Sequence, residues 1–301
     1  MDTEEAVSER QEDRAAGYRH AGPTVPRMVL GAQLRRLREA RNITGAEAGE
    51  VIRASHSKIS RLEMGRTGFK RRDVDDLLTL YGVQDEGERA TLLALARQSN
   101  MPGWWHAYYE VVPPWLNLYL GLEQSARVIR TYELQFVPGL LQTEQYARDV
   151  IRLGFEGIPE EELERRVELR MRRQLVLHQP SPPHLWAVID EAALRRAMGS
   201  TEAMRAQLAH LIEMMEYRHI TIQVMSFAAG GHAAVSGPVT VIRPPGEELP
   251  DVVYLEQHTG GIYPDKPEEV DHYRHVMNRL ALRAEPPEAT TGILRRILAE
   301  T

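Results

Sequence analysis

The segment SHSKISRLEMG, residues 55 to 65, holds the side chains whose types and spacing best suit contact with nucleic acid. In a helix, Ile59 and Leu62 fall on one face, while hydroxyl, imidazole and guanidinium groups fall toward the other. An α-helix fits the major groove of DNA, and its first turns bring donors and acceptors to base edges when apolar residues are confined to the rear. The segment therefore predicts a helix that reads DNA bases.

A first helix is predicted from Leu30. Leu30, Leu34 and Leu37 follow one another at i, i+4 and i+7, and this stripe is expected to end near Asn42, a residue that tolerates left-handed backbone. Two later helices are expected after the basic segment. Their apolar residues are Leu77, Leu78 and Leu80 in the first of these and Leu92, Leu93 and Ala96 in the second.

A second helix is predicted immediately before the basic segment. The Thr44 side chain can accept an orphan backbone N–H, and Glu47 stands three residues later, as in a capping box. Two short helices joined by a tight turn, the second with polar groups at its N-terminal end, have the geometry of a helix-turn-helix. The inner face of this helix is expected to consist of Ala48, Val51 and Ile52.

Residues 30 to 97 resemble the lambda-repressor-like helix-turn-helix domains of the xenobiotic-response-element class, with ITGAEAGEVIRASHSKISRLEMG as the two central helices. The resemblance implies that His56, Ser57 and Arg61 read bases, and the guanidinium fork of Arg61 suits O6 and N7 of guanine. It places Lys58 beside the phosphate backbone. Further candidates for phosphate contacts are Arg66, Lys70 and Arg71.

Two positions depart from that family's pattern. Gly45 stands where the family usually has a glutamine that holds both a phosphate and a neighbouring recognition residue. We expect the Gly45 backbone N–H, at a helix N-terminus, to offer a phosphate contact without that help. Arg53 lies in the turn where glycine is common.

Arg38 and Glu63 occupy the places of a structural ion pair in the related domains. A partly buried arginine needs a carboxylate partner, so we favour this pairing over a contact between Arg38 and DNA. Replacing Arg38 is then expected to destabilise the domain and not to alter its specificity.

The length of 301 residues and the hydrophobic content of 43% allow one small and one medium globular domain. We expect a disordered tail over residues 1–26, a DNA-binding domain over 27–98, a linker over 99–114 and a regulatory domain over 115–301. Aromatics in WWHAYYEVVPPWL are favoured as packing anchors over a surface for base stacking. Without a membrane span or a secretory signal, the expected location is cytoplasmic.

The formal net charge of −6 is divided unevenly along the chain. Residues 27 to 72 contain twelve Lys or Arg and four Asp or Glu, a net of +8, which leaves −14 for the remainder. A basic module followed by an acidic body is typical of a localised phosphate-binding face, although charge runs are by default solvated surface.

The second half is predicted to be an α+β domain, which makes the whole chain multidomain, with an all-α five-helix domain first. Helices are expected in LEQSARVIRTYELQFVPGLLQTEQYARDVIR, broken at Pro138 and restarted at Thr143, and from Pro159 to His178. The β-branched and aromatic runs LWAVID, ITIQVMSF, GPVTVIRP and VVYLEQ predict strands. The remaining predicted helices are Glu191 to Met198, Glu202 to Tyr217, 267 to 283 and 288 to 299.

Six segments of this half resemble the C-terminal domain of unknown function in actinobacterial antitoxin-like helix-turn-helix regulators. They are PGLLQTEQYAR, the following RRQ, IDEAALRRAMG, AQLAHLIEMME, DVVYLEQHTGGIY and PEEVDHYRHVMNRL. That resemblance implies a transcriptional regulator, often encoded beside a small acidic partner protein, and hence a protein ligand or small-molecule effector. It carries over no catalytic residues.

Metal and enzyme chemistry are the less favoured alternatives. Asp190 with Glu191, or Glu256 with His258 and His232, could supply oxygen and imidazole ligands. However, Asp190 lies between a strand and a helix, where it would cap backbone N–H groups. Zero cysteines remove thiolate chemistry, and no HExxH, GxSxG or phosphate-loop motif is present. We expect no catalytic residue, metal or cofactor.

The sequence thus predicts a transcriptional regulator that binds double-stranded DNA as a homodimer on a pseudo-palindromic operator. Its C-terminal domain is expected to supply dimerisation, effector sensing or both. The alternative is an antitoxin-like adaptor that binds a small acidic partner protein and no longer needs DNA; a steep fall of DNA affinity with salt distinguishes the two.

Overall fold

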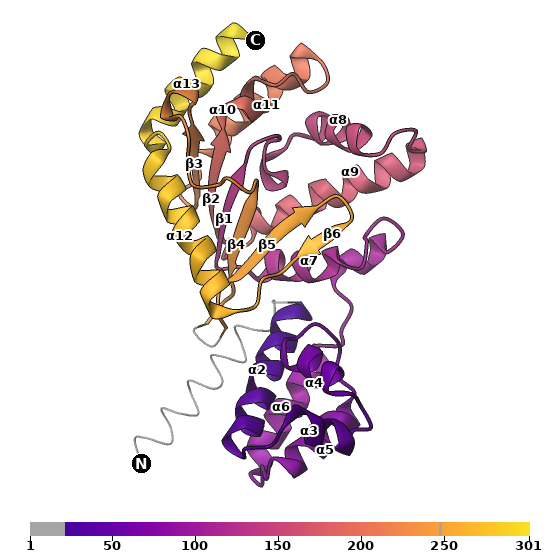
Figure 1. The fold of residues 1–301 in the computed structure, drawn as a ribbon. Helices are drawn as coiled ribbons and strands as arrows, with labels where there is room; N and C mark the ends of the chain where they lie inside the picture. Colours follow the sequence, from indigo (N-terminus) through magenta and orange to yellow (C-terminus); the bar gives the residue numbers. More distant parts are fainter. Residues whose placement is uncertain (1–21, 247–248) are drawn as a thin grey trace. The chain divides into compact units, whose positions relative to one another are not determined.

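The computed structural model describes residues 22–246 and 249–301, which form two compact units (Figure 1). The helical unit comprises residues 22–107, 117–125, 244–246 and 249–250, and the sheet unit comprises 108–116, 126–243 and 251–301. Among these described residues, no helix combines the length and the apolar character needed to cross a membrane.

Helices α2 to α6 of the helical unit share an apolar core. Leu30, Leu34, Ile59, Leu62 and Leu78 are all buried in it. The helices are α2 (Thr24–Ala40), α3 (Gly45–Val51), α4 (His56–Glu63), α5 (Arg71–Leu80) and α6 (Glu86–Gln98), followed by the short helix η1 (Trp104–Tyr108) and by α7 (Leu116–Ser125), which belongs to this unit from Asn117 onward.

Local sequence signals account for the ends of these helices. Asn42, just after α2, adopts a φ of 55°, as its tolerance of left-handed backbone predicts. Thr44 and Glu47 form the expected capping box of α3, and the Ser55 side chain accepts the Lys58 N–H at the start of α4. The expected inward position of Val51 is wrong, because its side chain is 42% exposed.

The beginning of the domain differs from its expected boundary. Most of the predicted tail, residues 1–21, lies outside the described residues. Its last part is not a tail, because α2 already begins at Thr24, and both Thr24 and Val25 are buried. Pro26 is accommodated because it stands in the first turn, where backbone N–H groups have no intrahelical acceptor.

A glycine allows α2 and α4 to approach closely. A Cβ atom at Gly31 would lie 2.5 Å from the carbonyl oxygens of both Leu62 and Glu63. Backbone atoms cannot give way as the end of a side chain can, so only glycine fits this crossing. The crossing fixes the end of α4 against α2.

The sheet unit contains a six-stranded mixed sheet in the order β3-β2-β1-β4-β5-β6. The first three strands are parallel, and β4, β5 and β6 continue the sheet in antiparallel pairs. The strands are β1 (Val128–Glu133), β2 (His184–Asp190), β3 (Ile220–Met225), β4 (Val239–Arg243), β5 (Val252–Gln257) and β6 (Gly260–Ile262).

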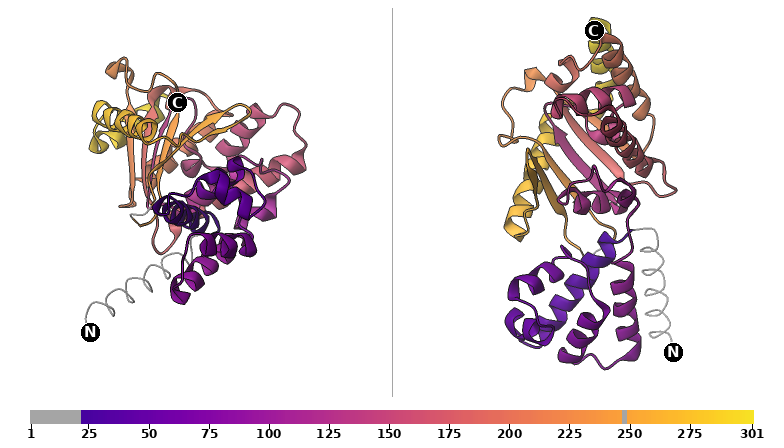
Figure 2. Two further views of the ribbon diagram at one scale, coloured as in Figure 1. Left: turned by 60° about the horizontal axis from the view of Figure 1, so that its bottom comes forward. Right: turned by 90° about the vertical axis from the view of Figure 1, so that its right-hand side faces the viewer.

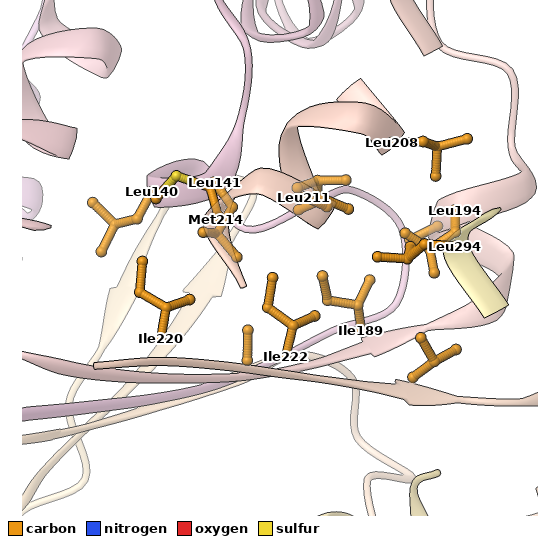
Figure 3. Close-up of a cluster of buried hydrophobic side chains, with 14 of the residues drawn as sticks. Leu140, Leu141, Ile189, Leu194, Leu208, Leu211, Met214, Ile220, Ile222 and Leu294 are labelled. Atoms are coloured by element: carbon orange, nitrogen blue, oxygen red, sulfur yellow. The ribbon is translucent and has the colours of Figure 1, made fainter. Parts of the chain in front are cut away.

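Helices cover both faces of this sheet, which can be followed from two further directions in Figure 2. On one face, Ile189 and Ile222 of the strands pack with Leu211 of α11 and Leu294 of α13 (Figure 3). On the other face, α12 packs through Met277. The helices of the unit are α8 (Glu144–Gly154), α9 (Glu160–Gln174), α10 (Glu191–Arg195), α11 (Thr201–Met214), α12 (Pro267–Arg283) and α13 (Pro287–Glu300), and its short helices are η2 (Gly139–Leu141), η3 (Leu175–His178) and η4 (Phe227–Ala229).

The central strand β1 is the main error in the predicted elements. Residues 128–133 were expected to be helical, yet VIRTYE pairs with β2 on one side and β4 on the other. Its Val, Ile, Thr and Tyr side chains favour strands. Successive side chains of a strand point to opposite faces, and Ile129 and Tyr132, three positions apart, are accordingly buried in two separate cores. The four strands that were predicted are confirmed as β2 to β5.

Candidate nucleic-acid interface

Helix α4 separates apolar and polar side chains as the sequence predicts. Ile59 and Leu62 are 2% and 3% exposed, whereas His56, Ser57 and Arg61 are exposed. Among the described residues, no carboxylate or carbonyl pairs with the Arg61 guanidinium. A free, always charged fork on an exposed helix face is the group required for bidentate contact with guanine.

The expected pair between Arg38 and Glu63 is present. Arg38 Nε and Nη2 donate to the two carboxylate oxygens of Glu63 at 2.6 and 2.9 Å, and Arg38 Nη1 donates to the Ile43 carbonyl at 2.8 Å. These hydrogen bonds to Glu63 raise the pKa of Arg38 above its ordinary value. Both side chains are largely buried, so the pair joins α2 to the end of α4 and is withdrawn from DNA.

The predicted phosphate contacts differ in their exposure to solvent. Lys70 and Arg71, at the start of α5, and Arg66, just before it, are exposed, whereas Lys58 is only partly exposed. The ammonium of Lys58 instead lies 3.3 Å from the Asp73 carboxylate. Asp73 was not singled out from the sequence, because a pair fifteen positions apart on different helices leaves no local pattern.

Gly45, the expected backbone contact for a phosphate, lies beside the side chain of His56. It is buried, and a Cβ atom there would lie 2.7 Å from His56 Cδ2, so the imidazole ring covers the first residue of α3. Arg53, the second departure, is exposed and adopts a φ of 53°, which is the left-handed conformation that favours glycine.

In the sheet unit, Asp190 and His232, two of the residues considered as metal ligands, both contact Tyr132, which the sequence analysis did not single out. The Tyr132 hydroxyl lies 3.2 Å from Asp190 Oδ2 and 3.1 Å from His232 Nε2. His232 Nδ1 accepts the Ala234 N–H at 3.3 Å, which leaves the proton of a neutral ring on Nε2, facing Tyr132. Burial, followed by the charge of Asp190, raises the pKa of Tyr132.

The other carboxylate oxygen of Asp190 accepts the Ala192 N–H at 2.9 Å, which confirms the expected cap of α10. Glu256 instead accepts a hydrogen bond from Tyr254 on its own strand. Within the described ranges, no group of three His, Asp or Glu side chains is arranged to hold a metal ion.

Glu133, the last residue of β1, has a carboxyl group with a raised pKa. Burial raises the pKa of Glu133 to about 8, with a further contribution from the charge of Glu256, while Arg170 and Arg173 act in the opposite direction. Sequence analysis gave no signal for it, because its position inside the unit depends on β1 being a strand.

Comparison with known families agrees with this division of the chain. Residues 29–92 match the family model of a helix-turn-helix domain, and residues 116–296 match that of a domain of unknown function (DUF5753), which is more than half of the chain. The chain belongs to the DUF5753 family. No curated protein and no solved structure shows significant similarity to it.

The match to the helix-turn-helix family covers all of α3 and α4, so the exposed residues of α4 lie on a DNA-binding motif. This DUF5753 protein is accordingly a DNA-binding regulator by its N-terminal domain. The DUF5753 match begins at residue 116, in α7, and includes every strand of the sheet.

Proposed function

We propose that this protein is a sequence-specific transcriptional regulator in which α4 is the recognition helix. The observation that carries the proposal is the exposure of His56, Ser57 and Arg61 on one helix face above the buried Ile59 and Leu62. Arg61 supplies the strongest discrimination, because a bidentate contact with guanine is worth about 1–3 kcal/mol against a wrong base.

The charge of the helical unit supports phosphate binding beside the recognition helix. Residues 27 to 72 carry a net +8, while the chain as a whole carries −6. Lys70 and Arg71 follow α4 in the chain and are exposed. Neutralised phosphates release counterions. A plot of the logarithm of the affinity for duplex DNA against the logarithm of the salt concentration should therefore have a slope of about −0.9 for each phosphate contact.

A single helix-turn-helix reads only half of an operator. In a symmetric dimer, two copies of α4 would enter successive major grooves about 34 Å apart, which makes a pseudo-palindromic operator the expected target. We assign dimerisation to the sheet unit. Its β3 edge is closed, because the Glu285 N–H and the Thr290 hydroxyl donate to the β3 carbonyls of Val224 and Ile222, each at 2.9 Å. The dimer would therefore use another surface.

We further propose that the sheet unit senses an effector or partner by binding and not by catalysis. In this proposal the cluster of Tyr132, Asp190 and His232 has a structural role: the Asp190 oxygens are engaged by Tyr132 and by the Ala192 N–H, and the His232 nitrogens by Tyr132 and the Ala234 N–H. Groups held in this way fix the loop after β3 against the ends of β1 and β2.

The test is selection of duplexes from a randomised DNA library by the purified full chain, followed by affinity measurements between about 50 and 200 mM salt. Enrichment of an inverted repeat, with a steep fall of affinity with salt, is the expected result. A chain that enriches no duplex and shows no salt-dependent DNA binding would instead be the adaptor for an acidic partner. Light scattering that gave a monomer, both free and on DNA, would remove the dimer.

A further inference from the structure

We infer that Gly45 is a specificity-determining residue, because it allows the His56 ring to lie back over the start of α3. The inference rests on the proposed function, since it concerns how the same helix reads DNA. Its basis is steric: a Cβ atom at position 45 would lie 2.7 Å from His56 Cδ2 and 3.1 Å from His56 Nε2. No side chain larger than hydrogen fits beneath the ring in its present orientation.

The ring is the partner that would move. His56 is exposed at the first position of α4, and no hydrogen bond holds its imidazole among the described residues. The backbone of α3 is held more firmly. The Thr44 hydroxyl accepts the Glu47 N–H, the Glu47 carboxylate accepts the Thr44 N–H, and Gly49 lies against the Ala54 carbonyl in the turn. A new side chain at position 45 therefore turns the imidazole about its own torsions and leaves α3 in place.

When the imidazole turns, its ring nitrogens point in a different direction. The two ring nitrogens are the only hydrogen-bonding groups of this side chain, and they move with the ring. Since His56 stands in the first turn of α4, where a recognition helix meets base edges, its orientation changes which base or phosphate it can reach. Gly45 thus acts as a positioning residue, because the absence of a side chain there determines which groups on DNA His56 can reach.

The substitution Gly45→Ala should affect thermal stability and DNA affinity in different ways. Gly45→Ala replaces glycine in the first turn of a helix, which on its own favours the folded state. We therefore expect the thermal midpoint to stay the same or rise, while affinity for the wild-type duplex falls at least five-fold. A purely structural role for Gly45 would lower stability and DNA affinity together.

The experiment is a double-mutant cycle on the duplex most enriched by the wild-type full chain. The variants are Gly45→Ala, His56→Ala and both together, with Gly87→Ala, in the first turn of α6, as the matched helix glycine. In the wild-type background Gly45→Ala should lower affinity at least five-fold and alter the base preferred at one position of each half-site. In the His56→Ala background it should change affinity less than two-fold, and Gly87→Ala should leave affinity unchanged.

Equal effects of Gly45→Ala in the two backgrounds would overturn the inference. So would the lack of an NMR contact between the His56 Hδ2 and Gly45 Hα protons in the free protein, which can be checked without DNA. Binding of Arg61→Ala to the same duplex distinguishes failure of the role of Gly45 from failure of the proposed function. If the wild type enriches a sequence and Arg61→Ala loses it, failure of the cycle removes only the role of Gly45; if no sequence is enriched, the proposed function falls as well.

Discussion

The Arg38 guanidinium donates a hydrogen bond to each carboxylate oxygen of Glu63, at 2.6 and 2.9 Å, where α2 and α4 cross. The Arg38 side chain is 13% exposed and the Glu63 side chain is 8% exposed, so little water can reach a carboxylate or guanidinium that has lost its partner. The pair therefore connects the end of the recognition helix to the rest of the helical unit. Its removal should lower the free energy of unfolding and leave the base preference of the folded protein unchanged.

Arg38→Ala should lower the free energy of unfolding of the helical unit by about 3–5 kcal/mol, because it leaves the Glu63 carboxylate buried without its cation. Chemical denaturation measures the change. Arg36→Ala, an exposed neighbour on α2, should alter it by less than about 0.5 kcal/mol. If Arg38→Met with Glu63→Leu were no more stable than Arg38→Ala alone, the buried charge would not be the cause.

The pair between Lys58 and Asp73 predicts a gain in DNA binding. Asp73→Asn should release the Lys58 ammonium for a phosphate, which raises affinity at low salt and makes the slope of log affinity against log salt more negative by about 0.9. Asp76→Asn on the same helix removes the same charge but breaks a pair with Arg72. Identical effects of the two variants would mean that net charge, and not Lys58, is responsible.

The left-handed backbone at Arg53 predicts a stabilising substitution. Arg53→Gly should raise the free energy of unfolding by roughly 0.5–1 kcal/mol, because glycine adopts a φ of 53° without the steric cost of a Cβ atom. Asn42→Gly, at a φ of 55°, should gain less, since asparagine tolerates this region. A loss of stability in Arg53→Gly would show that the Arg53 side chain contributes a contact of its own.

Glu133 predicts how the sheet unit responds to pH. Between about pH 4.5 and 8 the folded protein keeps a proton on Glu133 that the unfolded chain loses, so stability should fall as pH rises through this window. Glu133→Gln should flatten that fall and raise the thermal midpoint most at pH 8. The exposed Glu161→Gln serves as control; equal pH profiles for wild type and Glu133→Gln would contradict the raised pKa.

Short-range chemistry made the helical unit predictable from sequence. The capping box of Thr44 and Glu47, the left-handed Asn42 and the inward Ile59 and Leu62 all depend on residues within one or two turns. Val51 was misplaced because α3 has only seven residues, too few for a helical period to separate its faces clearly. The predicted strands β2 to β5 were recognisable because glycine or proline bounds their β-branched runs.

Long-range contacts explain what the sequence did not reveal. β1 follows a helical stretch without a glycine or proline between them, so nothing local marks where the helix ends and the strand begins. Its β-branched and aromatic residues favour a strand, and pairing with β2 and β4 selects it. The contact of Gly45 with His56, and the meeting of Tyr132 with His232, join residues whose separation carries no periodic signal. The expected base and phosphate contacts themselves remain predictions until DNA is bound.

The most direct test of base reading through α4 is the affinity of Arg61→Ala for the duplex that the wild-type chain enriches. Arg97→Ala, an exposed arginine on α6, controls for the loss of one positive charge. We predict that Arg61→Ala binds roughly 10- to 100-fold more weakly and no longer prefers guanine at one position of each half-site, with unchanged stability, while Arg97→Ala retains that preference. Equal affinity and base preference in Arg61→Ala and wild type would contradict the account.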